Sequence, residues 1–286
     1  MSQHGASATT ERPGTQPSWL AGLLAERRPL VMGVLNVTPD SFSDGGRFID
    51  PERAVAQARL MVEAGADIID IGAESTRPYG GMTPVSRDEE IARLAPVLGT
   101  VVALGKPVSI DTMKAEVARW ALAEGAAMAN DVWGLQRDPG MAGVVAESGL
   151  PVVVMHNRDS ADPAIDIMTD LAAFFERSLA IADHAGIARG RIVLDPGIGF
   201  GKTPEQSMTC IARLRELERF GLPLLVGASR KRFIHSVTPA PPDRRIGGSI
   251  AAHLVAATNG AAIIRAHDVA ETVQALRVTA AIEAFR

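Results

Sequence analysis

The stretch RIVLDPGIGFGKTPEQSMTCIARLRELERF, residues 191–220, contains one complete unit of the fold. It begins with a short apolar run bounded by turn residues, and such a run predicts a buried strand. A loop rich in glycine follows the run. From residue 204 onward the apolar residues recur at helical spacing, which predicts a helix over 204–220. The stretch is therefore a strand, a loop and a helix in succession.

The loop of this unit ends in Gly201, Lys202 and Thr203, which is also how the phosphate-binding loop of ATP-binding proteins ends. That loop follows the pattern G-x-x-x-x-G-K-[ST], whose first glycine would stand at position 196. This position holds Pro196, and Gly197 comes one residue too late. The sequence therefore does not support an ATP site, and we interpret Lys202 as a loop residue.

The same alternation occurs eight times after residue 30. The apolar runs are LVMGVLNVT (30–38), DIIDIGA (67–73), PVSIDT (107–112), AMANDV (127–132), PVVVMH (151–156), RIVLDP (191–196), PLLVGAS (223–229) and AAIIRAHD (261–268). The helix candidates are 51–65, 86–104, 113–124, 139–148, 165–186, 204–220, 247–259 and 268–284. Strands joined by helices run parallel, and near-continuous apolar runs indicate strands covered on both faces. The pattern predicts an α/β fold, a closed (β/α)8 TIM barrel. An open doubly wound sheet is disfavoured because no G-x-G-x-x-G follows the first strand.

Composition limits the other properties of the chain. We predict one barrel domain over 29–286, because no linker is visible after residue 30. Residues 1–28 are polar and lack the apolar segment of a secretory signal, which predicts a flexible lead-in and a cytoplasmic protein. No membrane span is expected, since no run of about 18 apolar residues occurs. The net charge of −4 and the aromatic content of 4% argue against a nucleic-acid partner. The single cysteine, Cys210, excludes an intrachain disulfide.

Polar residues end every predicted strand, where TIM barrels carry their chemistry. In chain order they are Asn36, Glu74-Ser75-Thr76-Arg77, Asp111, Asn130-Asp131, His156-Asn157, Asp195, Ser229-Arg230-Lys231, and Arg265 with His267. Helix capping explains two or three of them, but not polar groups at all eight ends. We therefore expect these side chains to face one mouth.

The charges at this mouth predict two kinds of contact. Cationic side chains belong to the second, seventh and eighth units, and barrels commonly bind phosphate at the last two. Asp111, Asn130 and Asp195, together with a lysine, match the edge of a flat heterocycle that carries amino, N–H and carbonyl groups. Asn36 and Asp40 offer the oxygen ligands that Mg2+ prefers. The residues alone thus suggest a heterocycle on one side and a phosphate group on the other.

Seven strings resemble, in order and spacing, those of dihydropteroate synthases. They are MGVLNVTPDSFSDGG (32–46), ESTRP (74–78), SIDT (109–112), NDVWG (130–134), LDPGIGFGKT (194–203), GASRKRFI (227–234) and RAHD (265–268). The resemblance implies a transferase of folate biosynthesis that condenses 7,8-dihydropterin-6-ylmethyl diphosphate with p-aminobenzoate, giving 7,8-dihydropteroate and pyrophosphate. It also implies Mg2+ as the cofactor and a homodimer formed through the later helices.

The resemblance implies site residues by motif position. For the pterin ring these are Asp111, Asn130, Asp195 and Lys231. For the diphosphate they are Thr76, Arg265 and His267, with Asn36 on Mg2+ and Arg77 as a further substrate contact. For p-aminobenzoate, in the pocket that also binds sulfonamides, they are Pro78, Phe200, Ser229 and the stem of Lys231. The residues expected to act in catalysis are Asp111, Lys231, Arg265 and His267.

The sequence departs from the family pattern in three places. Ala73 stands where a glycine is common, the segment YGGMTPVS after Pro78 is longer than usual, and the fifth strand ends in MHNRDSADP. His156 is interpreted either as a binding residue or as one that satisfies backbone groups, and Asn157 and Arg158 have no assigned role. Glu74 is expected to orient its neighbours.

Two alternative functions keep the barrel. One is the pterin-binding domain of a methyltetrahydrofolate methyltransferase, and the other is a catalytically silent paralogue. Ser229-Arg230-Lys231 and Arg265 with His267 argue against methyl transfer, because that reaction leaves no pyrophosphate anion to hold. A silent paralogue usually loses its cationic or Mg2+-facing residues, whereas this chain keeps Asn36, Thr76, Lys231, Arg265 and His267.

Overall fold

The computed structural model describes residues 19–38, 50–74 and 85–285, and its eight parallel strands close into a barrel in chain order. The strands are β1 (Leu30–Asn36), β2 (Ile68–Gly72), β3 (Val108–Asp111), β4 (Met128–Asp131), β5 (Val152–Met155), β6 (Ile192–Asp195), β7 (Leu224–Val226) and β8 (Ala261–Ala266). β1 pairs with β8, which closes the ring. The TIM barrel predicted from the sequence is confirmed.

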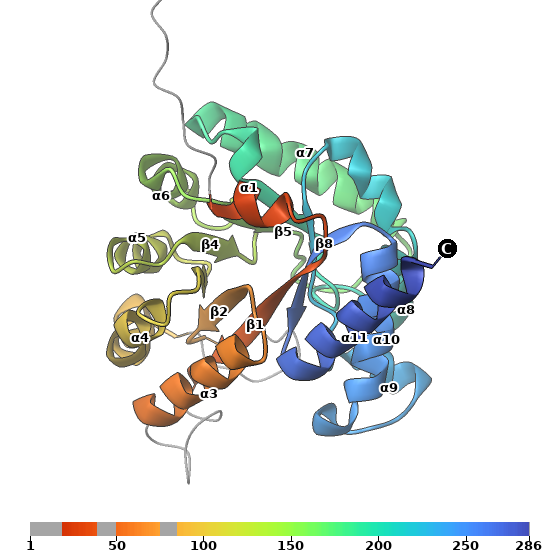
Figure 1. Ribbon diagram of the computed structural model, residues 1–286. Helices are drawn as coiled ribbons and strands as arrows, with labels where there is room; N and C mark the ends of the chain where they lie inside the picture. The colour runs from red at the N-terminus through yellow and green to blue at the C-terminus, as the bar shows by residue number, and fades with distance from the viewer. Residues whose placement is uncertain (1–18, 39–49, 75–84, 286) are drawn as a thin grey trace, which may run out of the picture.

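Helices surround the strands (Figure 1). They are α3 (Pro51–Glu63), α4 (Arg87–Val102), α5 (Ala115–Ala123), α6 (Met141–Ser148), α7 (Ile167–Ala185), α8 (Pro204–Ala212), α9 (Arg232–Val237), α10 (Ile246–Thr258) and α11 (Val269–Glu283). Short 3-10 helices are η1 (Arg189–Arg191), η2 (Leu214–Phe220) and η3 (Pro242–Arg244).

Two of these elements differ from the prediction. The helix predicted over 204–220 is α8 followed by the 3-10 helix η2. At the junction Arg213 pairs with Glu216 at 2.6 Å, and residues three apart are eclipsed in a 3-10 helix, which favours that pair. Helix α9 was not predicted, because it is only six residues long.

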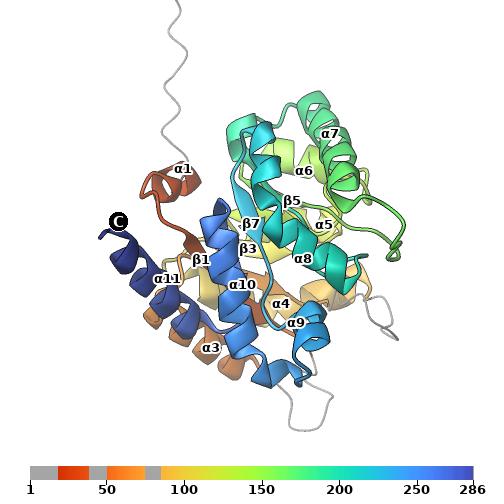
Figure 2. The same ribbon diagram turned by 90° about the vertical axis from the view of Figure 1, so that its right-hand side faces the viewer.

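An N-terminal helix, α1 (Trp19–Leu24), covers the amino ends of the strands. Leu20 is 1% exposed and belongs to the same apolar cluster as Leu30 and Met32 of β1. The Trp19 indole N–H donates to the carbonyl oxygen of Ala127 at 3.3 Å. Figure 2 shows α1 and α9 at opposite ends of the molecule. The last ten residues of the predicted lead-in thus include a packed helix, while residues 1–18 lie outside the described part.

The interior of the barrel changes from apolar to polar along the strands. Near the amino ends a buried cluster takes one residue from most strands, namely Met32, Ile68, Met128, Val153, Val193, Leu225 and Ile263. Side chains alternate along a strand, so the residue two positions later also points inward. On β2, β4, β6 and β8 that residue is Asp70, Asn130, Asp195 and Arg265. A polar layer therefore lies directly above the apolar one, toward the carboxyl ends.

None of the helices in the described ranges is both long and apolar enough to cross a membrane.

Candidate active site

Arg265 on β8 connects the polar groups of three other strands. Its Nε donates to Oδ2 of Asp70 at 2.6 Å, and its Nη2 donates to Oδ2 of Asp111 at 2.7 Å. The same oxygen of Asp70 accepts a hydrogen bond from Nδ2 of Asn130 at 3.1 Å. Burial disfavours the guanidinium charge, but the two carboxylates raise the pKa of Arg265 above its ordinary value. The site thus holds a permanent cation between two acids.

The three polar side chains around this cation each keep one unpaired oxygen. Within the described part of the chain, Oδ1 of Asp70, of Asp111 and of Asn130 have no hydrogen-bond partner. Leaving a buried acceptor unpaired costs about 1–3 kcal/mol. Burial raises the pKa of Asp111 to about 7, although Arg265 opposes this shift. A ligand that brings N–H donors would relieve both effects.

Lys231 immediately precedes α9 and is close enough to Arg265 and Asp111 for their charges to act on it. Its Nζ is 4.0 Å from the centre of the Phe200 ring, a cation–π contact. Burial, and then the charge of Arg265, lower the pKa of Lys231 to about 7, while Asp195 and Asp111 oppose the shift. Residues from the β3, β6 and β8 units thus act on one ammonium group.

Asp195 ends β6 and holds the start of the next loop. Its Oδ1 accepts a hydrogen bond from the backbone N–H of Gly197 at 2.7 Å. Burial raises the pKa of Asp195 to about 6, and the charges of Lys231 and Arg265 oppose this rise. The expectation that Asp195 and Arg265 share one mouth agrees with these interactions.

His267 follows β8 and is held by Ser229, which follows β7. The Ser229 hydroxyl oxygen accepts the backbone N–H of His267 at 3.2 Å and lies 3.0 Å from its Nδ1. The hydroxyl oxygen can accept from both nitrogens, so the ring tautomer decides which partner of the Ser229–Nδ1 bond donates. Burial, and then Arg265, lower the pKa of His267 to about 3, so the ring is neutral at neutral pH. His267 is therefore a neutral hydrogen-bonding group rather than a cation in this state.

Arg230, one of the cations expected at the mouth, has a structural partner instead. Its Nε donates to Oδ2 of Asp268 at 3.0 Å, and its Nη2 pairs with the other carboxylate oxygen. Its backbone φ is 58°, in the left-handed region, and Arg245 donates to its carbonyl oxygen at 2.9 Å. This ion pair joins the loops after β7 and β8.

The remaining expected contacts are placed only in part. Thr76, Arg77, Pro78 and Asp40 lie outside the described residues. Asn36 ends β1, opposite Gly72 of β2. Among the described residues, no cluster of three or more His, Cys, Asp or Glu side chains suited to a metal ion occurs.

The structure also adds residues that the sequence analysis did not assign. Asp70 is fully buried and pairs with Arg265. The sequence could have indicated it, because it is an acid within an apolar strand and stands two residues after Ile68, on the inward-facing side. Lys114 pairs with Glu74 at 2.5 Å and with the buried Glu90 at 2.6 Å. Glu74 also accepts the backbone N–H of Val85 at 3.1 Å. The expectation that Glu74 orients its neighbours is consistent with these contacts.

The polar mouth and the strand order together define a class of protein. The profile of the family described as pterin binding enzyme matches residues 32–267, a range that contains every strand except the start of β1. The class is therefore that of barrel enzymes that bind a pterin.

Relatives specify the family within this class. Dihydropteroate synthase of Bacillus subtilis is 43% identical over 270 residues, which cover 94% of this chain and 92% of the relative. A dihydropteroate synthase of Xanthomonas albilineans solved with 4-aminobenzoic acid has a TM-score of 0.86 and 46% identity, covering 90% of this chain and 94% of that one. The same enzyme in complex with 7,8-dihydropteroate has a TM-score of 0.82 and 43% identity, covering 90% and 94%. The chain belongs to the dihydropteroate synthase family, as its sequence motifs predicted, and is a transferase of folate biosynthesis.

Proposed function

We propose that this chain joins 7,8-dihydropterin-6-ylmethyl diphosphate to p-aminobenzoate and releases pyrophosphate. The C–O bond to the diphosphate breaks, the aniline nitrogen forms a C–N bond to the same carbon, and the nitrogen loses a proton. The observation that carries the proposal is the pair of unpartnered buried acceptors on Asp111 and Asn130 beside the Arg265 cation.

The pterin ring supplies what these acceptors lack. Its amino group and ring N–H are donors that Oδ1 of Asp111 and Oδ1 of Asn130 would accept. Lys231 and Asp195 would contact the opposite edge of the ring. As the C–O bond breaks, positive charge develops in the ring, and the nearby Asp111 carboxylate would stabilise it.

Arg265 and His267 would hold the departing diphosphate. The acids Asp70 and Asp111 keep Arg265 charged and aimed before substrate arrives, and such preorganisation stabilises developing charge at little reorganisation cost. In the tautomer with its proton on Nε2, His267 would donate to a phosphate oxygen. A methyl-transfer reaction would have no such anion for the two residues to bind.

Asn36 fits a role as a ligand of Mg2+. Its side-chain amide is an oxygen donor at the rim, and Mg2+ usually takes one or two protein oxygens together with waters and substrate phosphates. When bound there, the ion would neutralise charge on the leaving diphosphate. Thr76 is proposed as a further diphosphate contact.

The second substrate would lie against Phe200. Phe200 is 8% exposed and packs with Val132 and Met155, and the Lys231 ammonium lies 4.0 Å from the centre of its ring. Ser229 is proposed as a contact of the p-aminobenzoate carboxylate, with Arg77 and Pro78 completing the pocket. Holding the aniline nitrogen beside the reacting carbon would accelerate the attack by proximity.

A coupled assay for pyrophosphate release, with and without p-aminobenzoate, tests this function. We expect release only when both substrates are present. A Lys231→Ala variant with unchanged circular dichroism is a second test, and its kcat/KM should fall about tenfold to hundredfold, because a charge contact in the site is lost. Release that does not depend on the amine would contradict the proposal.

A second copy of the chain is the partner that we propose, and it would cover an apolar groove. The groove encloses about 570 Å3 between α8, α9 and α10. Val237 and Val255 line it and are 67% and 48% exposed, which is unusual for large apolar side chains that gather around one concavity. The homodimer and the cytoplasmic location predicted from the sequence both stay proposals.

A further inference from the structure

Lys202 is a buried cation that the proposed reaction does not use. Its side chain is 2% exposed. Its Nζ lies 2.9 Å from the carbonyl oxygen of Gly197, 3.0 Å from that of Phe200 and 2.7 Å from Nδ1 of His156. An ammonium group has three donors, so these three acceptors account for all of them. Two of the acceptors belong to the loop that carries Phe200.

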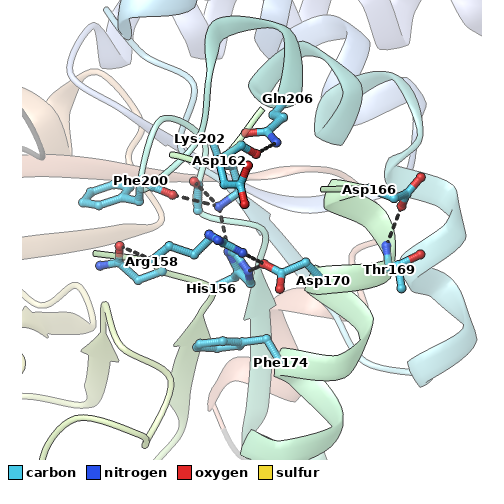
Figure 3. A network of polar contacts seen from close by, with 12 residues as sticks. His156, Arg158, Asp162, Asp166, Thr169, Asp170, Phe174, Phe200, Lys202 and Gln206 are labelled. Atoms are coloured by element: carbon cyan, nitrogen blue, oxygen red, sulfur yellow. Dashed lines mark hydrogen bonds and ion pairs between the residues drawn. The ribbon is translucent and has the colours of Figure 1, made fainter. Parts of the chain in front are cut away.

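A chain of polar contacts continues from Lys202 to α7 (Figure 3). Because Nδ1 of His156 accepts from Lys202, the ring proton lies on Nε2, which donates to Oδ2 of Asp170 at 3.0 Å. Arg158 donates to the same oxygen at 2.8 Å. Burial lowers the pKa of Lys202 from 10.5 to about 8, and burial, then Lys202, lower that of His156 to about 4. At neutral pH these polar contacts therefore run from the Lys202 ammonium through the neutral His156 imidazole to the Asp170 carboxylate, which also binds the Arg158 guanidinium.

Two glycines of this loop allow its backbone to pack closely against the segment after β5. Gly197 and Gly201 have φ values of +65° and +54°. A Cβ at Gly197 would lie 1.9 Å from the carbonyl oxygen of His156, and one at Gly201 would lie 2.5 Å from that of Arg158. The Gly-Lys-Thr ending therefore turns its lysine into the protein, in contrast to a phosphate-binding loop.

The far end of the loop is tied to α8. Thr203 accepts the backbone N–H of Gln206 at 3.2 Å, and Gln206 Oε1 accepts that of Thr203 at 3.0 Å. Asp195 holds the first turn through Gly197. Between these ties, Lys202 supplies the side-chain bond to the carbonyl oxygen of Phe200 itself.

We propose that Lys202 is a positioning residue for the aromatic-amine substrate, because its buried ammonium holds loop 196–203 so that the Phe200 ring stays against Lys231. His156 acts through Lys202, and Asp170 acts through His156. The inference rests on the proposed function, since it assigns a support to the p-aminobenzoate pocket of that reaction.

Substituting the lysine tests the proposal kinetically. Lys202→Met keeps the apolar stem and removes all three hydrogen bonds. We expect KM for p-aminobenzoate to rise about tenfold or more, as loss of a charge-assisted hydrogen bond does, and KM for the pterin diphosphate to change less than about threefold. Lys106→Met is the matched control, because Lys106 precedes β3 at the other end of the barrel, and both KM values should stay unchanged.

A pair of His156 variants tests the same loop without touching the lysine. His156→Gln can accept from Lys202 and donate to Asp170, whereas His156→Phe can do neither. We expect the glutamine variant to keep KM for p-aminobenzoate within about threefold of the wild type and the phenylalanine variant to raise it about tenfold. This pair decides the question if Lys202→Met does not fold.

Two outcomes would overturn the proposal. One is a fall in kcat with both KM values unchanged, which indicates only a smaller folded fraction. The other is unchanged amide hydrogen exchange over residues 196–203 in substrate-free Lys202→Met, where the proposal requires faster exchange than in Lys106→Met. The exchange measurement needs no turnover, so it can contradict this inference whether or not the proposed reaction is correct. Failure of the proposed reaction would appear separately, as a wild-type protein without amine-dependent pyrophosphate release.

Discussion

Asp70 fixes the position of the Arg265 guanidinium in the site. It is fully buried, and its Oδ2 accepts hydrogen bonds from both Arg265 and Asn130. Arg265 would otherwise have one acid partner, Asp111, and that carboxylate is the one proposed to contact the pterin. Removing the charge of Asp70 would therefore disturb Arg265 and Asn130, two proposed substrate contacts, although Asp70 itself is not proposed to touch the substrate.

We expect Asp70→Asn to lower kcat/KM for the pterin diphosphate by about tenfold to hundredfold, because a hydrogen bond to a charged partner is worth about 1.5–3 kcal/mol. Steady-state pyrophosphate release measures the change. Asp67→Asn is the matched control, because Asp67 pairs with Arg28 at 2.7 Å near the amino end of β2 and should affect stability rather than kinetics. Equal kinetic losses in both variants would remove the special role of Asp70.

At the scale of elements, α10 and α11 enclose a histidine that must stay neutral. His253 is 1% exposed, and its Nδ1 lies 3.3 Å from the Thr272 hydroxyl, which donates to the carbonyl oxygen of Asp268. Nδ1 is thus the donor, and Nε2 has no partner among the described residues. Burial lowers the pKa of His253 to about 4, although the charge of Asp268 opposes the shift.

The pH dependence of stability follows from this depressed pKa. Between pH 6.5 and about 4 the unfolded chain binds a proton at His253 that the folded chain does not, so the stability present above pH 6.5 is lost as the pH falls toward 4. Urea unfolding from pH 7 to 4.5 should show that His253→Asn loses less stability than the wild type, by up to about 1.4 kcal/mol per pH unit. If both proteins lost the same free energy of unfolding over this pH range, His253 would be excluded as the cause of the loss.

At the scale of the whole molecule, an apolar groove of about 570 Å3 lies between α8, α9 and α10. These three helices lie next to one another on one side of the barrel (Figure 2). Barrel closure leaves no strand edge to pair, so association must use helix faces. Val255 lies on α10, lines this groove and is 48% exposed.

We expect the wild type to have twice the mass of one chain in light scattering after size exclusion. Val255→Asp should shift it toward the mass of one chain, because a buried unpaired carboxylate is strongly unfavourable in an apolar interface. Leu60→Asp, which places the same charge at a 58% exposed position on α3, should leave the mass unchanged. A wild type with the mass of one chain, or an unchanged mass in Val255→Asp, would contradict the proposed dimer.

Local pattern was sufficient for the barrel and for grouping four polar residues at its mouth. Apolar runs alternating with helical periodicity specify strand and helix, and parallel strands place their carboxyl ends at one rim, so Asp111, Asn130, Asp195 and Arg265 could be grouped before any coordinates. Helix α1 was not foreseen, because a six-residue helix is stabilised only by the apolar barrel floor it covers.

By itself the sequence determined the fold class, the order of the strands and the family, because periodicity and motif spacing are properties of the chain. The tertiary structure alone decided which polar groups pair. Asp70 supports Arg265, Arg230 turns to Asp268, and Lys202 points into its own loop. The physical reason is that hydrogen-bond partners and burial depend on residues up to 195 positions apart, as Asp70 and Arg265 are, and these meet only when the barrel closes.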